Sequence, residues 1–329
     1  MTRRGSNGTR WILSLLRGLP LCVVGCVFLT ADSQSPPLPR DAMRSLVADI
    51  ADHARARIPG FLVIAQNGDE LLTLSEESSD LLASEFITAI DGLGREDLFY
   101  GYSEDNEPTP SESTQWMLAY LDRAEAVGIE VLVIDYCWAP ASMDDSYERN
   151  AARGFVSFAA SRRELNVIPE YPVRPFDANT EDVRFLAGVE NFLYLINPEQ
   201  YGTKAAFVDA LADTNYDALV VDLEFDGAPL LAQDVSALRV KANGGARLVL
   251  CYLSIGEAED YRGYWDPEWE MMPPDWLLEE NPDWPGNYPV RYWNSDWRDI
   301  VFEMLDVVLS AGFDGVYLDR VDVYEEFEI

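Results

Sequence analysis

Carboxylate and amide side chains end or follow most of the apolar runs of this chain. They are Gln66, Asn67, Glu96, Asp135, Glu170, Asn197, Asp222, Glu224, Glu257, Glu259, Asp319 and Asp322. Any one of them alone is typical of a helix cap or a solvated acid. Brought together, they suit glycoside hydrolysis, in which one carboxyl group protonates the leaving oxygen and a second attacks or activates water.

Other kinds of catalytic site fit the composition less well. The chain has one histidine, His53, in a polar helical stretch, so neither a Ser-His-Asp triad through His53 nor a Cys/His zinc site is expected. Clustered acids also suit calcium or magnesium, but no EF-hand spacing is present. We therefore expect no metal and no cofactor, and keep a metal-dependent hydrolase with an ion among Asp222, Asp319 and Asp322 as an alternative.

The elements that must position these acids alternate along the chain. Strand-like apolar runs occur at 61–66, 87–93, 131–136, 165–170, 192–197, 218–224, 248–254 and 315–319. Helical patterns lie between several of them, at 113–127, 204–212, 232–241 and 297–311. Strands alternating with helices indicate a parallel sheet, and eight strands close a barrel, so we predict an α/β fold, the (β/α)8 TIM barrel. In that fold the carboxyl ends of the strands line the active face.

The order of the elements is unusual for such a barrel. The sequence stops at Ile329, just after the eighth run, and a helical stretch, Asp41 to Ala56, precedes the first run. This helix either fills the slot of the eighth barrel helix, which would make the barrel circularly permuted, or caps the barrel at its amino end.

The first 31 residues have the composition of an export signal. Arg3, Arg4, Arg10 and Arg17 accompany an apolar stretch, Leu19 to Leu29, and acidic residues are missing. We expect cleavage after Ala31 and release of a secreted protein. Anchoring of a lipoprotein through Cys26 is the alternative, and the only route by which we expect contact with a membrane. Residues 32–40 read as a linker, and residues 41–329 as a single catalytic domain.

The cysteines beyond the signal are Cys137 and Cys251. Both stand in apolar strand-like runs, where a cysteine is usually a small core residue. A bridge between the two is the less favoured alternative.

The charge balance is strongly acidic. Asp and Glu number 58 against 24 Lys and Arg, for a formal net charge of −34. Such a surface repels the phosphates of nucleic acids and attracts cationic ligands. The acidity is therefore either an adaptation of the surface to its surroundings or a sign of a cationic substrate, such as a polymer of free amino sugars, and charge alone does not separate the two.

A long segment after the seventh run, 255–297, is rich in aromatic residues. They are Tyr261, Tyr264, Trp265, Trp269, Trp276, Trp284, Tyr288, Tyr292, Trp293 and Trp297. Aromatic rings cover the apolar faces of sugars, so the segment predicts a polysaccharide platform, although about half of these rings would be expected to pack the loop onto the barrel.

Several motifs resemble those of glycoside hydrolase family 114. The longest are Leu250 to Arg262 (LCYLSIGEAEDYR) and Gly312 to Asp322 (GFDGVYLDRVD), and Tyr216 to Glu224 (YDALVVDLE) is similar too. In relatives that begin differently, segments similar to the shorter pieces Ala65 to Gly68 and Gly94 to Gly101 come after the last motif, whereas here they precede it. The resemblance therefore favours the circular permutation.

The resemblance implies an activity like that of endo-α-1,4-polygalactosaminidases. It assigns catalysis to Asp319, in the last motif, and to Glu96, in one of the short pieces. Around them we expect substrate-binding residues, namely Asn67, Asp135, Asp222, Tyr252, Glu257, Arg262, Trp265, Trp293 and Asp322.

The function expected is thus that of a secreted glycosidase, a monomer acting on an extracellular, galactosamine-rich, α-1,4-linked polysaccharide with no nucleic-acid partner. A non-catalytic carbohydrate-binding barrel is the alternative from another class. The fold prediction is specific: residues 315–319 should pair with residues 61–66, and helix 41–56 should pack between the helices that flank the seventh and first strands.

Overall fold

The computed structural model describes residues 37–328. The predicted export signal, 1–31, lies outside the described residues, as does most of the predicted linker. The linker prediction is wrong at its end, because helix α1 (Pro39–Arg57) already begins at Pro39, where proline suits the first turn of a helix. Among the described residues, no helix is both long and apolar enough to cross a membrane.

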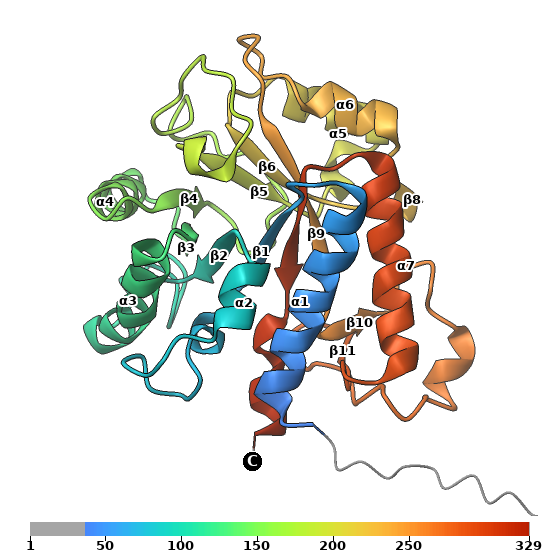
Figure 1. Cartoon of the computed structure of the whole chain (residues 1–329). Helices are drawn as coiled ribbons and strands as arrows, with labels where there is room; N and C mark the ends of the chain where they lie inside the picture. The colour runs from blue at the N-terminus through green and yellow to red at the C-terminus, as the bar shows by residue number, and fades with distance from the viewer. Residues whose placement is uncertain (1–36, 329) are drawn as a thin grey trace, which may run out of the picture. The chain divides into compact units, whose positions relative to one another are not determined.

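Eight parallel strands form the centre of the fold, a (β/α)8 barrel (Figure 1). They are β1 (Leu62–Gln66), β2 (Gly92–Glu96), β3 (Glu130–Tyr136), β4 (Val156–Ala160), β5 (Phe192–Leu195), β6 (Ala218–Asp222), β9 (Leu248–Ser254) and β12 (Gly315–Asp319). Their hydrogen-bonded order is β4-β3-β2-β1-β12-β9-β6-β5. Nearly every residue of these strands is buried, as expected of parallel strands covered on both sides.

Helices cover the outside of the barrel. Besides α1 they are α2 (Ser84–Ala89), α3 (Ser111–Ala126), α4 (Pro140–Ala151), α5 (Lys204–Ala212), α6 (Ala232–Leu238) and α7 (Ser295–Ala311). Two antiparallel pairs decorate the loops: β7 (Glu224–Phe225) with β8 (Ala228–Pro229), and β10 (Glu257–Glu259) with β11 (Asn287–Pro289). Short 3₁₀ helices are η1 (Asp69–Leu72), η2 (Leu186–Gly188), η3 (Glu199–Tyr201), η4 (Pro267–Glu270) and η5 (Val321–Phe327).

Two of the predicted strands are misplaced. The predicted strand 87–93 lies mostly ahead of β2, because Ile87 belongs to α2 and the strand begins at Gly92. The predicted strand 165–170 is wrong: these residues form a loop, and Leu165 has a left-handed backbone (φ 48°) that no regular strand contains. The true fourth strand, β4, comes a few residues earlier.

The junction of the first and last strands agrees with the prediction. β1 pairs with β12 in parallel, from Leu62 opposite Gly315 to Ala65 opposite Leu318. A Cβ atom at Gly315 would lie 2.5 Å from the carbonyl oxygen of Leu62, so glycine permits this close approach. Helix α1 packs against α2 and α7, between the helices that flank β1 and β9 (Figure 1). It therefore occupies the eighth helix position of the barrel.

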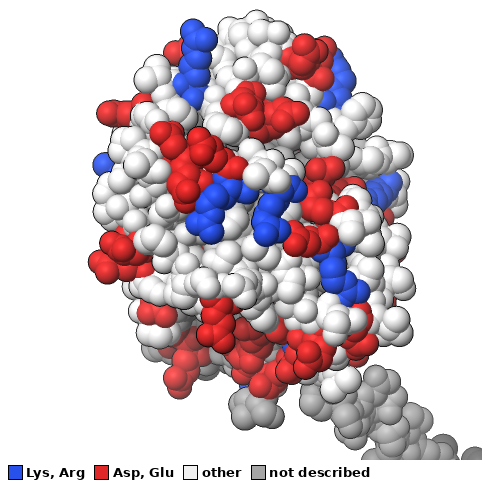
Figure 2. All heavy atoms as spheres, turned by 90° about the vertical axis from the view of Figure 1, so that its left-hand side faces the viewer, with Lys and Arg blue, Asp and Glu red and all other residues white. Residues whose placement is uncertain are grey.

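On one face of the molecule, acidic side chains gather toward one end. On the face drawn in Figure 2, basic groups lie beside acidic ones over the middle, whereas acidic groups dominate the lower edge. The lower edge corresponds to the end toward which β12 points in Figure 1, where the carboxyl ends of the parallel strands lie.

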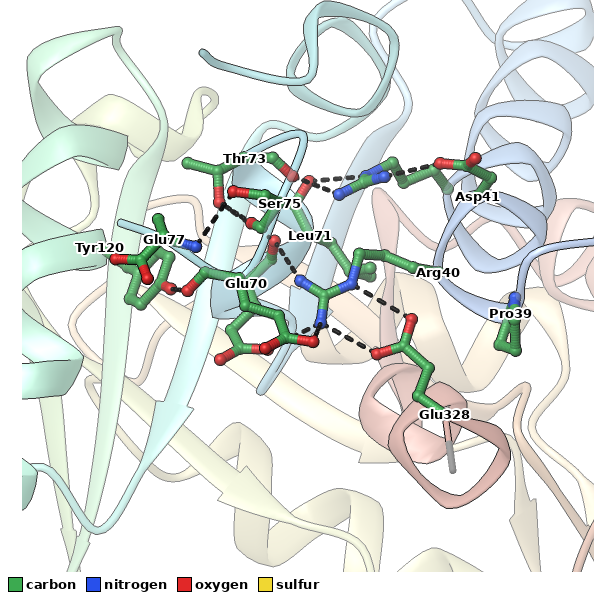
Figure 3. A network of polar contacts seen from close by, with 12 residues as sticks. Pro39, Arg40, Asp41, Glu70, Leu71, Thr73, Ser75, Glu77, Tyr120 and Glu328 are labelled. Carbon is green, nitrogen blue, oxygen red and sulfur yellow. Dashed lines mark hydrogen bonds and ion pairs between the residues drawn. The ribbon is translucent and has the colours of Figure 1, made fainter. Parts of the chain in front are cut away.

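A buried arginine ties α1 to the last element of the described chain (Figure 3). The Arg40 guanidinium donates to Glu70 Oε2 at 2.9 Å and to Glu328 Oε2 at 3.0 Å, and it lies 5.0 Å from the centre of the Tyr324 ring. One turn further along α1, Arg44 Nε donates to the carbonyl oxygen of Leu71 at 3.0 Å. These contacts hold α1, η1 and η5 together at the β1–β12 junction.

We predict that Arg40→Met lowers the free energy of unfolding by about 1–3 kcal/mol, because it leaves Glu70 and Glu328 without their cation. Urea unfolding followed by circular dichroism measures this. The control is Arg184→Ala, which removes an exposed pair with Asp182 and should cost less than about 1 kcal/mol. Equal losses in the two variants would contradict the importance of the junction.

Candidate functional site

The carboxyl ends of the strands surround a cavity of about 590 Å³. Seven of the predicted site residues line it: Asn67, Glu96, Asp222, Tyr252, Glu257, Asp319 and Asp322. They come from segments that are far apart in the sequence, and the barrel brings them together because parallel strands all end on the same side.

Neutral hydrogen-bond donors hold the Glu96 carboxylate at the end of β2. Asn67 Nδ2 donates to Glu96 Oε2 at 2.9 Å, while the Glu96 backbone N–H donates to Asn67 Oδ1 at 3.2 Å. The Tyr136 hydroxyl donates to the other carboxylate oxygen. Asn67 has a left-handed backbone (φ 57°), which asparagine tolerates better than most residues, and this turn directs its amide at Glu96.

Neutral donors also hold Asp319, at the end of β12. Gln66 Nε2 donates to Asp319 Oδ1 at 3.1 Å from β1, and the Tyr252 hydroxyl donates to Oδ2 at 2.8 Å from β9. Burial raises the pKa of Asp319 to about 7, with further increases from the negative charges of Glu96 and Asp322. Below pH 7 the Asp319 carboxyl group therefore carries a proton in the folded protein.

Arginines neutralise the other part-buried acids of the cavity. Arg320, which has a left-handed backbone (φ 58°) just after β12, pairs with Glu257 at 3.0 Å and with Asp322 at 3.6 Å. Burial raises the pKa of Asp322 to about 6, although Arg320 acts in the opposite direction. Among the described residues, neither Glu96 nor Asp319 has an ion pair, so these two carboxyl groups face the cavity without a cation.

A second arginine secures Asp222 from behind the cavity. Both of its carboxylate oxygens accept hydrogen bonds at 2.7 Å from Arg262, which also donates to Glu259 at 2.7 Å. Arg262 is buried and does not line this cavity, so the structure does not bring it together with the other predicted site residues there. Its guanidinium is occupied in holding Asp222 and the β10 segment in place.

Asp135, also predicted to bind substrate, does not line the cavity. The side chain is 0% exposed and accepts hydrogen bonds from the backbone N–H groups of Phe99 and Tyr100 and from the Ser146 hydroxyl. Successive strand residues point to opposite faces, so Tyr136, the next residue, enters the cavity while Asp135 faces α4. The Asp135 carboxylate therefore fixes the loop after β2 to α4.

The aromatic platform is smaller than predicted. Trp265 packs against Trp269 edge-to-face and against Tyr288 at a tilt, and Trp293 packs against Tyr292 and Phe327. Neither predicted tryptophan lines the cavity. From the long segment, Tyr261 and Trp284 do line it. Most of the remaining rings pack the segment onto the barrel.

Sequence reasoning missed Tyr136, Tyr194, Arg163 and Asn166 as residues of the cavity. Arg163 lies over the Tyr136 ring at 3.9 Å and pairs with Asp97 at 2.9 Å, so it braces the residue next to Glu96. It follows β4, the strand that the prediction misplaced. Tyr136 and Tyr194 stand in runs that were predicted as strands, and the alternation of side chains along those runs was the available signal.

Metal-binding geometry is not found in the part of the chain that the structure describes: no three or more His, Cys, Asp or Glu side chains are arranged to hold an ion there. Cys137 and Cys251 are both buried as free thiols. His53 pairs with Asp306 at 2.6 Å between α1 and α7, on the outside of the barrel.

Comparison with known proteins finds a match to one family in the later part of the chain. Residues 190–329 match the model of glycoside-hydrolase family GH114. This confirms the predicted resemblance over the strands from β5 to β12, which include Asp222, Glu257 and Asp319. Residues 37–189, with Glu96, lie outside the matched range.

Curated relatives match over a similar length. An uncharacterized protein of Methanocaldococcus jannaschii, MJ1477, is 42% identical over 125 residues, which are 38% of this chain and 36% of that protein. An uncharacterized protein of Deinococcus radiodurans is 43% identical over 122 residues, which are 37% of this chain and 38% of that protein. The matched part thus spans little more than a third of these relatives. The crystal structure of Aspergillus fumigatus Ega3 in complex with galactosamine is 27% identical, with a TM-score of 0.27, over 34% of this chain and 39% of that chain.

We predict that Asp319→Asn improves stability more at pH 8 than at pH 5. Asp319 has a folded-state pKa of about 7, above its ordinary value of 3.8, so ionisation destabilises the folded protein as the pH rises toward 7 and above. The asparagine cannot ionise. The Tm of the variant minus the Tm of the wild type should therefore be roughly 3–6 °C greater at pH 8 than at pH 5.

The matched control is Asp80→Asn. A hydrogen bond from the Leu81 backbone N–H holds the pKa of Asp80 below its ordinary value, so Asp80 is ionised throughout this range. Its Tm difference should not change with pH. If Asp319→Asn behaved like Asp80→Asn, the raised pKa of Asp319 would be refuted.

Proposed function

We propose that this protein, whose residues 190–329 match glycoside-hydrolase family GH114, is a glycoside hydrolase that cleaves a polysaccharide with the carboxyl groups of Glu96 and Asp319. The observation that supports this most is the difference between the acids of the cavity. Asp222, Glu257 and Asp322 are neutralised by arginines, while Glu96 and Asp319 are held by neutral donors and share one cavity.

Two such groups can hold the single proton that glycoside hydrolysis needs. Burial, together with the negative charges of Glu96 and Asp322, raises the pKa of Asp319 to about 7, so Asp319 can carry this proton in weakly acidic to neutral solution. In the proposed reaction Asp319 protonates the oxygen of the leaving sugar as the glycosidic bond breaks. Glu96 attacks the anomeric carbon or takes a proton from the attacking water.

The surrounding donors determine what each carboxyl group can do. Asn67 and Tyr136 donate hydrogen bonds to both carboxylate oxygens of Glu96 and so fix the direction in which the carboxylate faces the cavity. Tyr252 and Gln66 orient Asp319 in the same way. Substitution of these four residues should disturb the geometry of the pair without removing it.

The proposed substrate is a cationic, galactosamine-rich polymer with α-1,4 linkages. The family resemblance suggests the sugar, and the chain's net charge of −34 suggests the positive charge of its amino groups. The acidic groups that dominate the lower edge of Figure 2, at the end where the strands' carboxyl ends lie, are consistent with this charge.

Export and circular permutation remain part of the proposal. The composition of residues 1–31 supports export, which amino-terminal sequencing of the protein recovered from culture medium tests. The packing of α1 against α2 and α7, in the eighth helix position of the barrel, supports the permutation. A relative's structure with the equivalents of β1 and β2 at the start of its barrel would refute the permutation.

Replacing either carboxylic acid by its amide should abolish hydrolysis. We expect Glu96→Gln and Asp319→Asn each to lose at least about 10²-fold in kcat on α-1,4-galactosamine polymer while folding normally. Reducing-end release measures the activity, and circular dichroism checks the fold. The control is Glu164→Gln: Glu164 lines the same cavity, its carboxylate makes no hydrogen bond or ion pair within residues 37–328, and we expect nearly full activity.

Three results would separate the alternatives. Full activity of Glu96→Gln would move its role to Glu257 or Asp222. Loss of activity on addition of a chelator, restored by a divalent cation, would favour a metal-dependent hydrolase. Binding of polymer by the wild type without any product would favour a non-catalytic binding protein.

Salt should weaken the action on a cationic polymer. Screening of the charges reduces the attraction between the acidic protein and protonated amino groups, so kcat/KM should fall several-fold between about 20 mM and 500 mM NaCl. The same polymer after complete N-acetylation has lost its charge and serves as the control. Equal salt dependence of the two polymers would contradict recognition of the charge and leave the acidity as an adaptation of the surface.

A further inference from the structure

A second hollow lies beside the catalytic cavity, at the carboxyl ends of β3 and β4. Its volume is about 460 Å³, within the range of about 300–1,000 Å³ that is usual for small-ligand pockets. Trp138, Ser161, Arg162, Ile168, Glu170 and Tyr171 contribute to its lining. We call it the Trp138 groove.

One loop separates the groove from the cavity. Residues 163–166 line the cavity, whereas residues 161, 162 and 167–171 line the groove. The carbonyl oxygen of Leu165 accepts hydrogen bonds from the backbone N–H groups of Ile196 at 3.0 Å and Asn197 at 3.3 Å, and Asn197 Nδ2 donates to the Glu164 carbonyl oxygen at 2.6 Å. Residues 163–166 therefore form a fixed ridge between two adjoining hollows.

Hydrogen bonds hold the backbone at Trp138 and the hydroxyl of Tyr171, the two aromatic residues of the groove. Trp138 is 54% exposed, yet its backbone N–H and that of Ala139 donate to Asn106 Oδ1 at 3.0 and 2.8 Å. The Tyr171 hydroxyl donates to Asp144 Oδ1 at 2.7 Å. A large exposed ring on a braced backbone offers a flat apolar surface at little cost in conformational entropy.

Polar groups around the ring are free to bind a ligand. Within residues 37–328 the side chains of Ser161, Arg162 and Glu170 make no hydrogen bond or ion pair, and Arg162 and Glu170 are exposed. A guanidinium, a carboxylate and a hydroxyl beside an aromatic face match a hexose ring, which has one apolar face and a rim of hydroxyl groups.

We propose that the Trp138 groove binds a sugar unit of the same polysaccharide, several units away from the bond that is cleaved. The proposal rests on the proposed function for its ligand, and on the shared ridge for its continuity with the cavity. A chain that leaves the cavity over residues 163–166 enters the groove and places one ring on Trp138. The groove thus favours long chains over short ones.

Chain length is the variable that tests this subsite. Trp138→Ala should raise KM for long α-1,4-galactosamine polymer by about 3- to 10-fold and leave kcat unchanged, since one aromatic contact is lost. On short oligomers that fill only the cavity, kcat and KM should equal those of the wild type. Trp138→Phe keeps a ring and should recover part of the affinity.

The control is Phe185→Ala. Phe185 is an aromatic residue next to η2, and its side chain is 77% exposed. It lies at the opposite end of the barrel from the groove, because the backbone N–H of nearby Val183 donates to the carbonyl oxygen of Ala246, just ahead of β9. It should behave as wild type on every substrate. An increase of KM with Trp138→Ala that is equal for long and short chains, or no increase, would overturn the subsite.

Binding separates this proposal from the catalytic one. Calorimetric titration of Asp319→Asn, and of Asp319→Asn with Trp138→Ala, against a panel of polysaccharides measures affinity without hydrolysis. If Asp319→Asn binds one of the polysaccharides and the double variant binds it more weakly, the result supports the groove. This holds even if the polysaccharide is not a galactosamine polymer and the proposed substrate is wrong. Equal binding by both proteins, or binding of no polysaccharide by either, refutes the groove.

Discussion

Repulsion between carboxylates is the constraint on which the site depends. A parallel barrel brings the ends of all its strands to one side, and in this chain many of those ends are acidic. Arg262 neutralises Asp222 and Glu259, Arg320 neutralises Glu257 and Asp322, and Arg163 pairs with Asp97. Within residues 37–328 Glu96 and Asp319 have no ion pair and are held by neutral donors instead. Burial, together with the negative charges of Glu96 and Asp322, raises the pKa of Asp319. Among the part-buried acids that line the cavity, these two are therefore the ones left without an arginine.

Much of the barrel could be predicted from the sequence because its strands are buried on both faces. Runs such as Ala218–Asp222 and Leu248–Ser254 are almost wholly apolar, and their limits follow from the polar residues around them. β4 escaped prediction because Ser157 interrupts its short apolar stretch, while the later segment 165–170 has apolar residues that pack a loop over the barrel end. Composition does not distinguish these two uses of a short apolar run.

The candidate site was predictable where a residue type and a strand end were sufficient. Asn67, Glu96, Asp319 and Asp322 belong to that group. Asp135 shows what is missing, since its position at a strand end was correct but its side chain points to the helix side. Arg262 is absent from the cavity lining for another reason: a charged residue in a motif can hold other residues of a site in place without lining the cavity itself. Such a role depends on three-dimensional neighbours from distant parts of the chain.

The edge between β4 and β5 gives the barrel an unusual mechanical property. These strands lie side by side, yet within the described residues no ladder of hydrogen bonds joins them, whereas the other seven neighbouring pairs are bonded. Strands β4 and β5 can therefore separate without breaking the backbone hydrogen bonds of a ladder. The loop 162–166 leaves β4 and attaches to the residues after β5 through Leu165, so it spans this edge at the end where the cavity lies. The ridge between the cavity and the groove is therefore anchored across the one edge of the described barrel that no ladder closes.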